Sequence, residues 1–388
     1  MDRFIAAKYR GSTKEMLTLD TDALARYTDI IDLSIGDTDF ITDEAVIDAA
    51  FRDAKRGYTR YGVPGGDPEL KDAIVRFWNR NYGISPTAGP IGPDQLYVVT
   101  ATCIGMTEVM LAMLDPGDEV IVLAPYFPIY KDQIEIAGGR AVIVELDAEN
   151  GYSLDREKIG AAVTDRTKAI IFNNPTNPTG RYYRRDEMEV LRTLALEHDI
   201  AIVADEVYTD YIYTDDFQAI RNLPDMADHT ITLNSFSKNF MMTGWRLGYI
   251  VADADFIKVI REINDAVMYA APSISQRAAI KAMELHDEIR EKYTKRFLER
   301  LRYATERIEK IPYFDLVKPE GTFYLFPSIK ATGLSSREFA AKALEDAHVM
   351  LTGGQIFGPN GEGHIRIACT VGMDSLKEAF DRLESLRF

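Results

Sequence analysis

Seven short apolar segments between residues 96 and 251 constrain the fold of this chain more than any other feature. Each is rich in Val and Ile on both faces, and helical periodicity recurs between them at 105–114, 154–163 and 186–198. Strands that are apolar on both faces are typical of a mostly parallel sheet with helices on either side. We therefore predict an α/β fold. The expected strands are 96–100, 119–123, 140–146, 168–172, 201–204, 230–233 and 247–251.

The rest of the chain predicts a second, smaller unit. Helical patterns dominate from residue 255 onward, and short strand patterns occur at 321–326 and 364–368. The first 44 residues contain too little apolar sequence to fold alone, so we expect them to pack with this C-terminal region. The predicted organisation is a large domain at 45–285 and a smaller α+β domain formed by 1–44 and 286–388.

Composition limits the partners and the setting. The chain of 388 residues is 46% hydrophobic and 27% charged, which is ordinary for a globular protein. Its formal net charge of −16 argues against nucleic acid and anionic membranes as partners. Two cysteines, Cys103 and Cys369, do not make a disulfide framework, so a reducing compartment is expected. Because neither a signal-peptide core nor an apolar run of about 18 residues occurs, we predict a cytoplasmic protein.

The segment Ser-Phe-Ser-Lys at 235–238 lies in a predicted loop between two strands, and Arg246 precedes the second of them. Loops at strand ends are where α/β proteins place their chemistry. The amine of Lys238 could form a Schiff base with an aldehyde, and Arg246 could bind a phosphate in a bidentate manner. The alternative is a solvated loop lysine and a surface arginine.

Four other segments that could hold a ligand follow predicted strands. Thr102 and Cys103 lie where a strand turns into a helix, whose N-terminal amides can bind phosphate. Phe127 could stack on a flat ring, although a core position is the simpler interpretation. Asn177 stands in a loop stiffened by two X-Pro steps. Asp205 follows four apolar residues, so its carboxylate should be buried and need a partner, which a salt bridge could also supply.

Together these segments match one ligand, which has a flat ring with a basic nitrogen, a phenolic oxygen, an aldehyde and a phosphate. That ligand is pyridoxal 5'-phosphate (PLP). Lys238 would supply the amine and Asp205 the charge opposite the ring nitrogen, while Asn177 and Tyr208 would reach the phenolic oxygen. No metal is predicted. The predicted phosphate contacts are Ser235, Ser237, Arg246 and the amides near Thr102 and Cys103.

These segments resemble the motifs of the fold type I, class I/II aminotransferases, the aspartate aminotransferase-like family, from about residue 30 to the C-terminus. The resemblance implies a PLP-dependent aminotransferase that moves an amino group between an L-amino acid and a 2-oxo acid by a ping-pong reaction. Lys238, through its Schiff base, Asp205 and Tyr208 would be the catalytic residues. The matching motifs are Asn-Pro-Thr-Asn-Pro-Thr-Gly at 174–180, Asp-Glu-Val-Tyr at 205–208, Ser-Phe-Ser-Lys at 235–238, Gly-Trp-Arg-Leu-Gly-Tyr at 244–249 and Ile-Arg-Ile at 365–367.

The resemblance also implies roles for residues outside these catalytic positions. Arg366 would bind the substrate α-carboxylate, with the Gly36 backbone and the Asn177 side chain as further contacts. Phe127 takes the place of the family's ring-stacking aromatic residue. Tyr61 resembles the tyrosine that reaches the phosphate of the neighbouring subunit's cofactor. A homodimer with shared active sites is therefore expected.

The sequence departs from the family pattern at three places. Thr102 and Cys103 stand where glycine is common, and Tyr130 replaces a histidine that backs the ring-binding aspartate in some members. Thr-Gly-Gly at 352–354 replaces a turn that often contains proline. None of these changes removes a reacting group.

Three other functions compete with transamination. A PLP-dependent carbon–sulfur β-lyase has the same fold, but such lyases often carry histidine in place of Tyr208. A nicotinamide-dependent dehydrogenase is disfavoured because no Gly-x-Gly-x-x-Gly follows a strand. A non-enzymatic regulator would need a DNA-binding segment, for which this acidic chain leaves no room. The substrate stays open, because a distal carboxylate could be bound by any of Arg10, Arg26, Arg60 and Arg277.

Overall fold

The computed structural model describes residues 2–6, 9–10, 26–214 and 216–388, and a seven-stranded sheet lies at its centre. The strand order is β2-β8-β7-β6-β5-β3-β4, and β8 runs antiparallel to both of its neighbours. The predicted α/β fold with a mostly parallel seven-stranded sheet is confirmed. The strands are β2 (Leu96–Val99), β3 (Glu119–Ala124), β4 (Arg140–Glu145), β5 (Thr167–Asn173), β6 (Ala201–Asp205), β7 (Thr230–Ser235) and β8 (Gly248–Val251).

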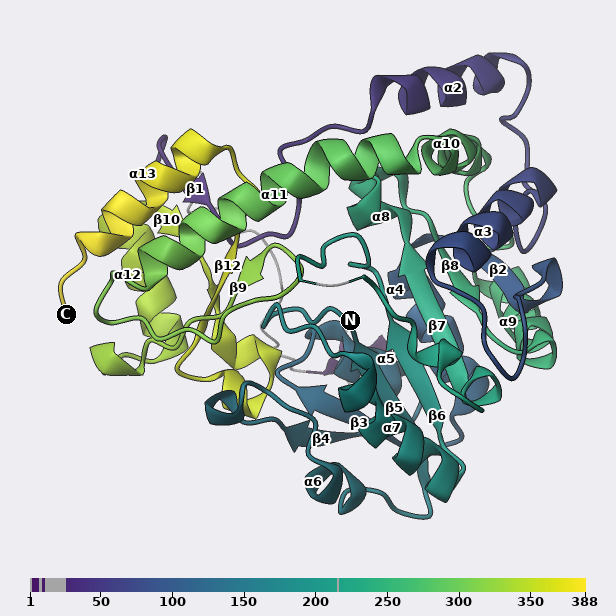
Figure 1. Cartoon of the computed structure of the whole chain (residues 1–388), viewed down its shortest axis with the longest axis horizontal. Helices are drawn as coiled ribbons and strands as arrows, with labels where there is room; N and C mark the ends of the chain where they lie inside the picture. Colours follow the sequence, from purple (N-terminus) through teal and green to yellow (C-terminus); the bar gives the residue numbers. More distant parts are fainter. Residues whose placement is uncertain (1, 7–8, 11–25, 215) are drawn as a thin grey trace.

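Helices cover both faces of this sheet (Figure 1). Successive residues of a strand point to opposite faces, so Val120 and Val122 of β3 pack in one apolar cluster and Ile121 and Leu123 in another. This burial on two sides explains why the strands are apolar throughout. The covering helices are α4 (Ala101–Met113), α5 (Ile129–Ile136) and α9 (Ala254–Val267) on one face, and α6 (Arg156–Gly160) and α7 (Arg185–His198) on the other.

Another apolar cluster lies around α3 (Pro68–Asn81), at the end of the sheet formed by β2 and β8. The helix begins as its sequence predicts, because Asp67 accepts the Glu69 N–H at 2.9 Å and Pro68 occupies the first turn. The same cluster includes residues of α2 (Glu44–Lys55), α10 (Ser273–Glu284) and the short α8 (Phe236–Asn239).

The smaller region combines a strand at residues 31–32 with the C-terminal part of the chain. Strand β1 (Ile31–Asp32) pairs in parallel with β10 (Val349–Met350), so this part of the N-terminal segment packs on the C-terminal region. The predicted packing of 1–44 as a whole includes residues outside the described ones and stays a prediction. A second sheet has the order β11-β12-β9 and is antiparallel. The remaining elements are β9 (Tyr324–Leu325), β11 (Thr352–Gly353), β12 (Ile365–Ala368), α12 (Ser336–Ala347) and α13 (Met373–Glu384).

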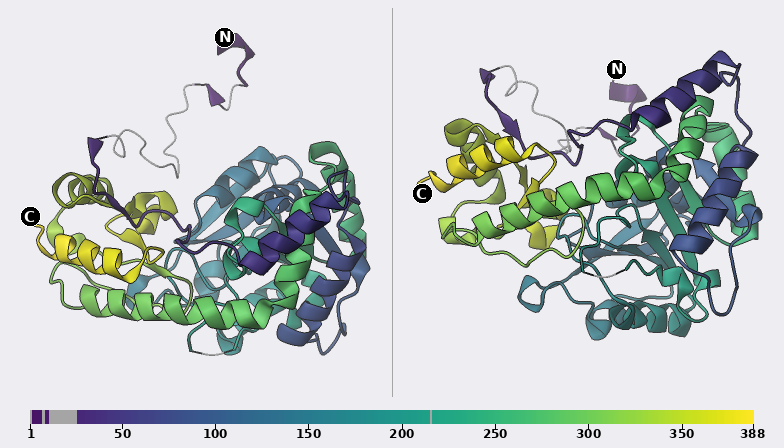
Figure 2. Two further views of the ribbon diagram at one scale, coloured as in Figure 1. Left: turned by 90° about the horizontal axis from the view of Figure 1, so that it is seen from above. Right: turned by 45° about the horizontal axis from the view of Figure 1, so that its top comes forward.

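The long helix α11 (His286–Ile308) runs along both parts of the molecule (Figure 2). Its first half contributes Tyr293 and Phe297 to the cluster around α3, and its second half contributes Leu301 and Ile308 to the core of the smaller region. The predicted domain division at 45–285 stays a prediction, since one helix belongs to both cores. Among the helices that the structure describes, none is both long and apolar enough to cross a membrane.

Candidate active site

A cavity of about 500 Å³ lies at the carboxyl ends of the central strands, where α/β sheets commonly bind ligands. Its walls come from the segments that follow β2, β3, β5, β6 and β7, and from loops and strands of the smaller region. The structure thus gathers every predicted site residue except Tyr61. The predicted residues that line the cavity are Gly36, Thr102, Cys103, Phe127, Asn177, Asp205, Tyr208, Ser235, Ser237, Lys238, Arg246 and Arg366.

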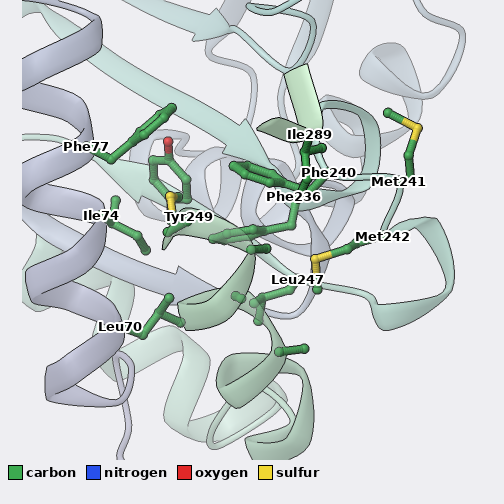
Figure 3. Packing of buried hydrophobic residues seen from close by; sticks show 14 of the residues in the cluster. Leu70, Ile74, Phe77, Phe236, Phe240, Met241, Met242, Leu247, Tyr249 and Ile289 are labelled. Atoms are coloured by element: carbon green, nitrogen blue, oxygen red, sulfur yellow. The ribbon is translucent and has the colours of Figure 1, made fainter. Parts of the chain in front are cut away.

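Lys238 lies on α8, a single helical turn that directly follows β7. Ser235 caps this turn, because its hydroxyl accepts the Ser237 N–H at 3.0 Å. Phe236 and Phe240 are buried, with ring centroids 5.3 Å apart, and belong to the apolar cluster around α3 (Figure 3). The aromatic residues therefore anchor the turn while the lysine side chain lines the cavity.

The Lys238 amine connects the large sheet to the smaller region. Its Nζ donates a hydrogen bond to the Gly36 carbonyl oxygen at 2.5 Å. The backbone carbonyl oxygen of Lys238 accepts a hydrogen bond from the Tyr211 hydroxyl at 2.8 Å, which fixes the backbone of the lysine. The amine thus lies beside the loop that is predicted to contact the substrate.

Asp205 ends β6 and is buried. Its Oδ2 accepts the Tyr130 hydroxyl at 2.5 Å, whereas its Oδ1 has no hydrogen-bond partner among the residues described. Burial raises the pKa of Asp205 to about 6, although the Tyr130 hydroxyl opposes that shift. A buried carboxylate with a free oxygen calls for a cationic or protonated partner in the cavity.

The loop after β5 aims Asn177 through a second asparagine. Asn173 accepts the Asn177 N–H at 2.7 Å and donates to the Asp205 carbonyl oxygen at 2.8 Å. The Asn177 side chain then accepts Arg366 Nη1 at 3.2 Å and donates to the Tyr208 hydroxyl at 3.4 Å. The Asn177 side chain therefore links Arg366, the predicted substrate contact, to Tyr208, a predicted cofactor contact.

The first turn of α4 is open to an anion. Its N-cap Thr100 makes no side-chain capping bond, and Ala101 has a φ of 63°. The Thr102 hydroxyl donates to the Asn234 carbonyl oxygen at 3.1 Å, so its hydrogen is already engaged. Backbone amides of this turn are thus the groups best placed to bind phosphate.

Positive charge lies beside the same helix end. Desolvation by the surrounding cavity walls raises the pKa of the Cys103 thiol, although this residue is partly open to solvent, and the nearby Arg246 guanidinium opposes that shift. Arg246 Nη1 donates to the Thr243 carbonyl oxygen at 2.7 Å, which fixes the guanidinium at the edge of the cavity. Together with the two serines of the Lys238 turn, Arg246 could hold the phosphate end of a ligand.

Arg366 is the buried cation of the site, with only 3% of its surface exposed. Its Nη2 donates to the Ser34 carbonyl oxygen at 2.5 Å, and its guanidinium lies over the rings of Tyr324 and Phe357 at 4.7 and 5.0 Å. Its hydrogen bonds go to Asn177 and Ser34, no carboxylate pairs with it in the described part of the chain, and its Nε has no partner there. Burial lowers the pKa of this guanidinium, and a carboxylate ligand would satisfy it.

Two predicted contacts lie apart from these charges. Phe127 is half-buried and lines the cavity, with its ring edge-to-face to Tyr130 at 5.7 Å. Tyr61 is 91% exposed, lies outside the cavity lining and contacts Tyr269 edge-to-face at 5.4 Å. A role for Tyr61 in this site would thus need a second copy of the chain.

None of the arginines considered for a distal carboxylate lines the cavity, namely Arg10, Arg26, Arg60 and Arg277. Arg277 instead pairs with Asp53 at 2.7 Å and with Glu69 at 2.6 Å.

Sequence reasoning missed two residues of this site. Asn173 stands next to the recognised motif at 174–180, and its place at the end of a predicted strand could have identified it. Tyr324 lines the cavity from β9, and no local pattern distinguished it from a core tyrosine.

The cavity fits PLP on three counts. One carboxylate oxygen of Asp205 is left for a protonated ring nitrogen. The N-terminus of α4 lacks a side-chain cap and suits a phosphate. Arg366 suits the carboxylate of an amino acid.

This fold and this cavity define a PLP-dependent enzyme of fold type I. The chain belongs to the class I and II aminotransferase family, whose sequence model matches residues 28–383. It is 36% identical to an aspartate aminotransferase of Bacillus subtilis over 363 residues, which is 92% of this chain and 91% of that protein.

Solved structures agree with this assignment. A mutant of Thermus thermophilus aspartate aminotransferase matches with a TM-score of 0.91, at 30% identity and 98% coverage of both chains. An aromatic aminotransferase from Pyrococcus horikoshii matches with a TM-score of 0.88, at 33% identity, covering 94% of this chain and 97% of that one. The chain is a PLP-dependent aminotransferase, and it acts on amino acids and 2-oxo acids. The resemblance, fold class, cofactor and reaction predicted from the motifs are confirmed.

Proposed function

We propose that Lys238, Asp205 and Arg366 carry out transamination in this cavity, with an acidic amino acid as the preferred donor. The observation that carries the site assignment is their convergence in one cavity. A lysine amine, a carboxylate with one unbonded oxygen and a guanidinium without a carboxylate partner among the described residues all line it. When bound, PLP supplies an aldehyde for the amine and a ring that accepts electrons.

The residues have separate tasks in this proposal. Asp205 keeps the proton on the ring nitrogen, because its buried carboxylate is stabilised by that positive partner. Arg366 binds the substrate α-carboxylate and so orients the Cα–H bond. Lys238 Nζ first binds the cofactor and, once displaced by the substrate amine, moves the proton from the α-carbon.

The substrate proposal is supported by the aspartate aminotransferases among the similar proteins. The Pyrococcus structure is named for aromatic substrates, so aromatic donors form the second group to test. The carbon–sulfur β-lyase remains the competing reaction, and the buried Tyr208, which bonds to Asn177, favours amino transfer over it.

A donor panel tests the substrate proposal. We expect purified PLP-loaded protein to use aspartate with 2-oxoglutarate at a kcat/KM at least about tenfold above phenylalanine or alanine, because each 1.4 kcal/mol of differential binding corresponds to a factor of ten. The measurement is glutamate formation from 2-oxoglutarate, because every donor of the panel yields glutamate, and pyruvate serves as a second acceptor for aspartate and phenylalanine. Cystathionine without an added oxo acid is the control, and pyruvate release from it at a comparable rate would establish a lyase instead.

We also propose a homodimer whose two active sites are shared. Tyr61 lies in an exposed apolar patch, and such patches mark interaction surfaces. A second copy that covers this patch could bring Tyr61 to the phosphate of its neighbour. We define this patch as the exposed apolar side chains of the segments 58–63 and 267–269, which the contact between Tyr61 and Tyr269 joins, namely Tyr58, Tyr61, Val63, Val267, Met268 and Tyr269.

Light scattering and subunit mixing test the homodimer. We expect a solution mass of twice 43.7 kDa. Tyr61→Ala and Lys238→Ala chains are each expected to be impaired, yet their co-expression should restore about a quarter of wild-type activity, since half of the dimers would hold one intact site. A monomer, or no restoration in a dimer that exchanges its chains, would contradict shared sites.

The free thiols Cys103 and Cys369 support our further proposal of a reducing, cytoplasmic setting.

A further inference from the structure

Tyr324 joins the cofactor side of the cavity to its substrate side. It is buried, with 2% of its surface exposed, and it lines the cavity from β9. Its hydroxyl lies 3.2 Å from the Tyr208 hydroxyl, and its ring faces the Arg366 guanidinium at 4.7 Å. β9 pairs directly with β12, the strand that carries Arg366. Tyr324 therefore contacts both Tyr208 and Arg366, which belong to the two sides of the proposed site.

The hydrogen bonds at Tyr208 limit where its hydrogen can point. A phenol has one hydrogen to donate and two lone pairs that accept. Asn177 Nδ2 donates to the Tyr208 oxygen at 3.4 Å, and Tyr324 is the other partner in the described structure. Burial raises the pKa of Tyr208, so the hydroxyl stays neutral. If Tyr324 donates, both lone pairs are used and the Tyr208 hydrogen is left for a ligand in the cavity.

The Tyr324 hydroxyl also lies against the loop that receives the Lys238 amine. A Cβ placed on Gly36 would stand only 1.8 Å from the Tyr324 oxygen, so the two are in direct contact. The Gly36 carbonyl accepts the Lys238 amine on the same loop. The backbone of Tyr324 is fixed as well, because its N–H donates to the Thr322 hydroxyl at 3.1 Å. Tyr324 is thus fixed where its oxygen meets both Tyr208 and the Gly36 loop.

We propose that Tyr324 is a positioning residue with two separable parts. Its hydroxyl donates to Tyr208 and thereby directs the single Tyr208 hydrogen to the phenolic oxygen of PLP. Its ring backs the Arg366 guanidinium and holds it in place for the substrate carboxylate. This inference rests on the proposed function in that Lys238 carries PLP and Arg366 binds the substrate.

Tyr324→Phe tests the hydroxyl, since it removes one oxygen and keeps the ring. The measurement is the pH titration of the visible absorbance of the lysine-bound cofactor. Donation from Tyr208 stabilises negative charge on the phenolic oxygen. That oxygen then interacts less strongly with the protonated nitrogen that joins the cofactor to Lys238, so the pKa of the nitrogen falls. Without Tyr324 the donation from Tyr208 should weaken, and the pKa should rise. We therefore expect the midpoint to rise by about 0.5 to 1 pH unit in Tyr324→Phe, as for the loss of one net hydrogen bond. The KM for the amino donor should stay within about twofold.

Tyr324→Leu tests the ring. It should show the same midpoint shift and, in addition, a KM about tenfold higher, because Arg366 loses the surface that orients it. Tyr313→Phe is the matched control, since it removes a buried hydroxyl that donates to the Leu383 carbonyl in the core of the smaller region and lies outside the cavity lining. It should leave both quantities unchanged.

The outcomes separate this inference from the proposed function. An unchanged midpoint in folded Tyr324→Phe, or an equal shift in Tyr313→Phe, would overturn the positioning role while leaving transamination intact. If Tyr324→Leu keeps the wild-type KM, the role of the ring is refuted. If Lys238→Ala and the wild-type protein show the same PLP absorbance, the proposed function is refuted instead.

Discussion

Lys238→Ala is expected to lower the rate of transamination by at least about 10⁴-fold, because the variant loses both the nucleophile and the group that moves the α-proton. The lysine is held for this task by the capped turn α8 and by the aromatic cluster behind it. The measurement is kcat/KM for the best donor of the panel. Lys238→Arg should be equally inactive, since a guanidinium keeps the charge but does not lose its proton.

A second readout separates chemistry from folding. Borohydride treatment of wild-type protein should leave PLP covalently attached to the peptide that contains Lys238, as detected by mass spectrometry. Neither variant should retain it. Lys258→Ala is the control, since Lys258 is exposed on α9 and pairs only with Asp255 among the residues described. Full activity of Lys238→Ala would disprove the assignment.

Asp205→Ala should still bind PLP through Lys238 and the phosphate contacts, but its kcat should fall by about 10² to 10⁴-fold. Removing one member of a buried charge pair typically costs about 3–5 kcal/mol, and each 1.36 kcal/mol on the barrier is a factor of ten. Asp205→Asn should lose nearly as much, because the amide keeps the volume without the charge. Asp165→Ala, which removes an exposed carboxylate, is the control. Full activity of Asp205→Asn would exclude a charge requirement.

Replacing Asp205, which should lower activity, should increase the stability of the protein without PLP. Because the folded pKa of Asp205 is raised from 3.8 to about 6, folding becomes less favourable as the pH rises through that interval. Above pH 6 the wild-type apoprotein should therefore be less stable than Asp205→Asn, by at most about 3 kcal/mol. Below pH 3.8 the carboxyl is protonated in both states and the difference should vanish. Urea unfolding of both apoproteins at several pH values measures this difference in stability. Equal stability at pH 7 would contradict a carboxylate that is destabilised by burial.

Local patterns predicted the sheet well, but not the geometry of every element. The antiparallel direction of β8 could not be predicted, since an apolar strand reads the same in either direction. The strand expected at 321–326 is only Tyr324–Leu325 in the structure. Thr322 adopts a φ of 60°, and Gly321 bonds to the Gly180 carbonyl, so this segment bends around the motif at 174–180 before pairing begins.

The sequence by itself determined the α/β fold, the aminotransferase family and the PLP cofactor, and it supplied the candidates for the reacting groups. Apolar periodicity is local, and the spaced motifs that contain Lys238, Asp205 and Arg366 together resemble one family, so these residues could be proposed without knowledge of their contacts. The resemblance already placed Tyr130 behind Asp205, and the structure shows the hydrogen bond between them. Only the tertiary structure decided that Asn173 aims Asn177 and that Tyr324 joins Tyr208 to Arg366. The reason is physical: a hydrogen bond between residues 116 positions apart, as between Tyr208 and Tyr324, exists only once the chain has folded.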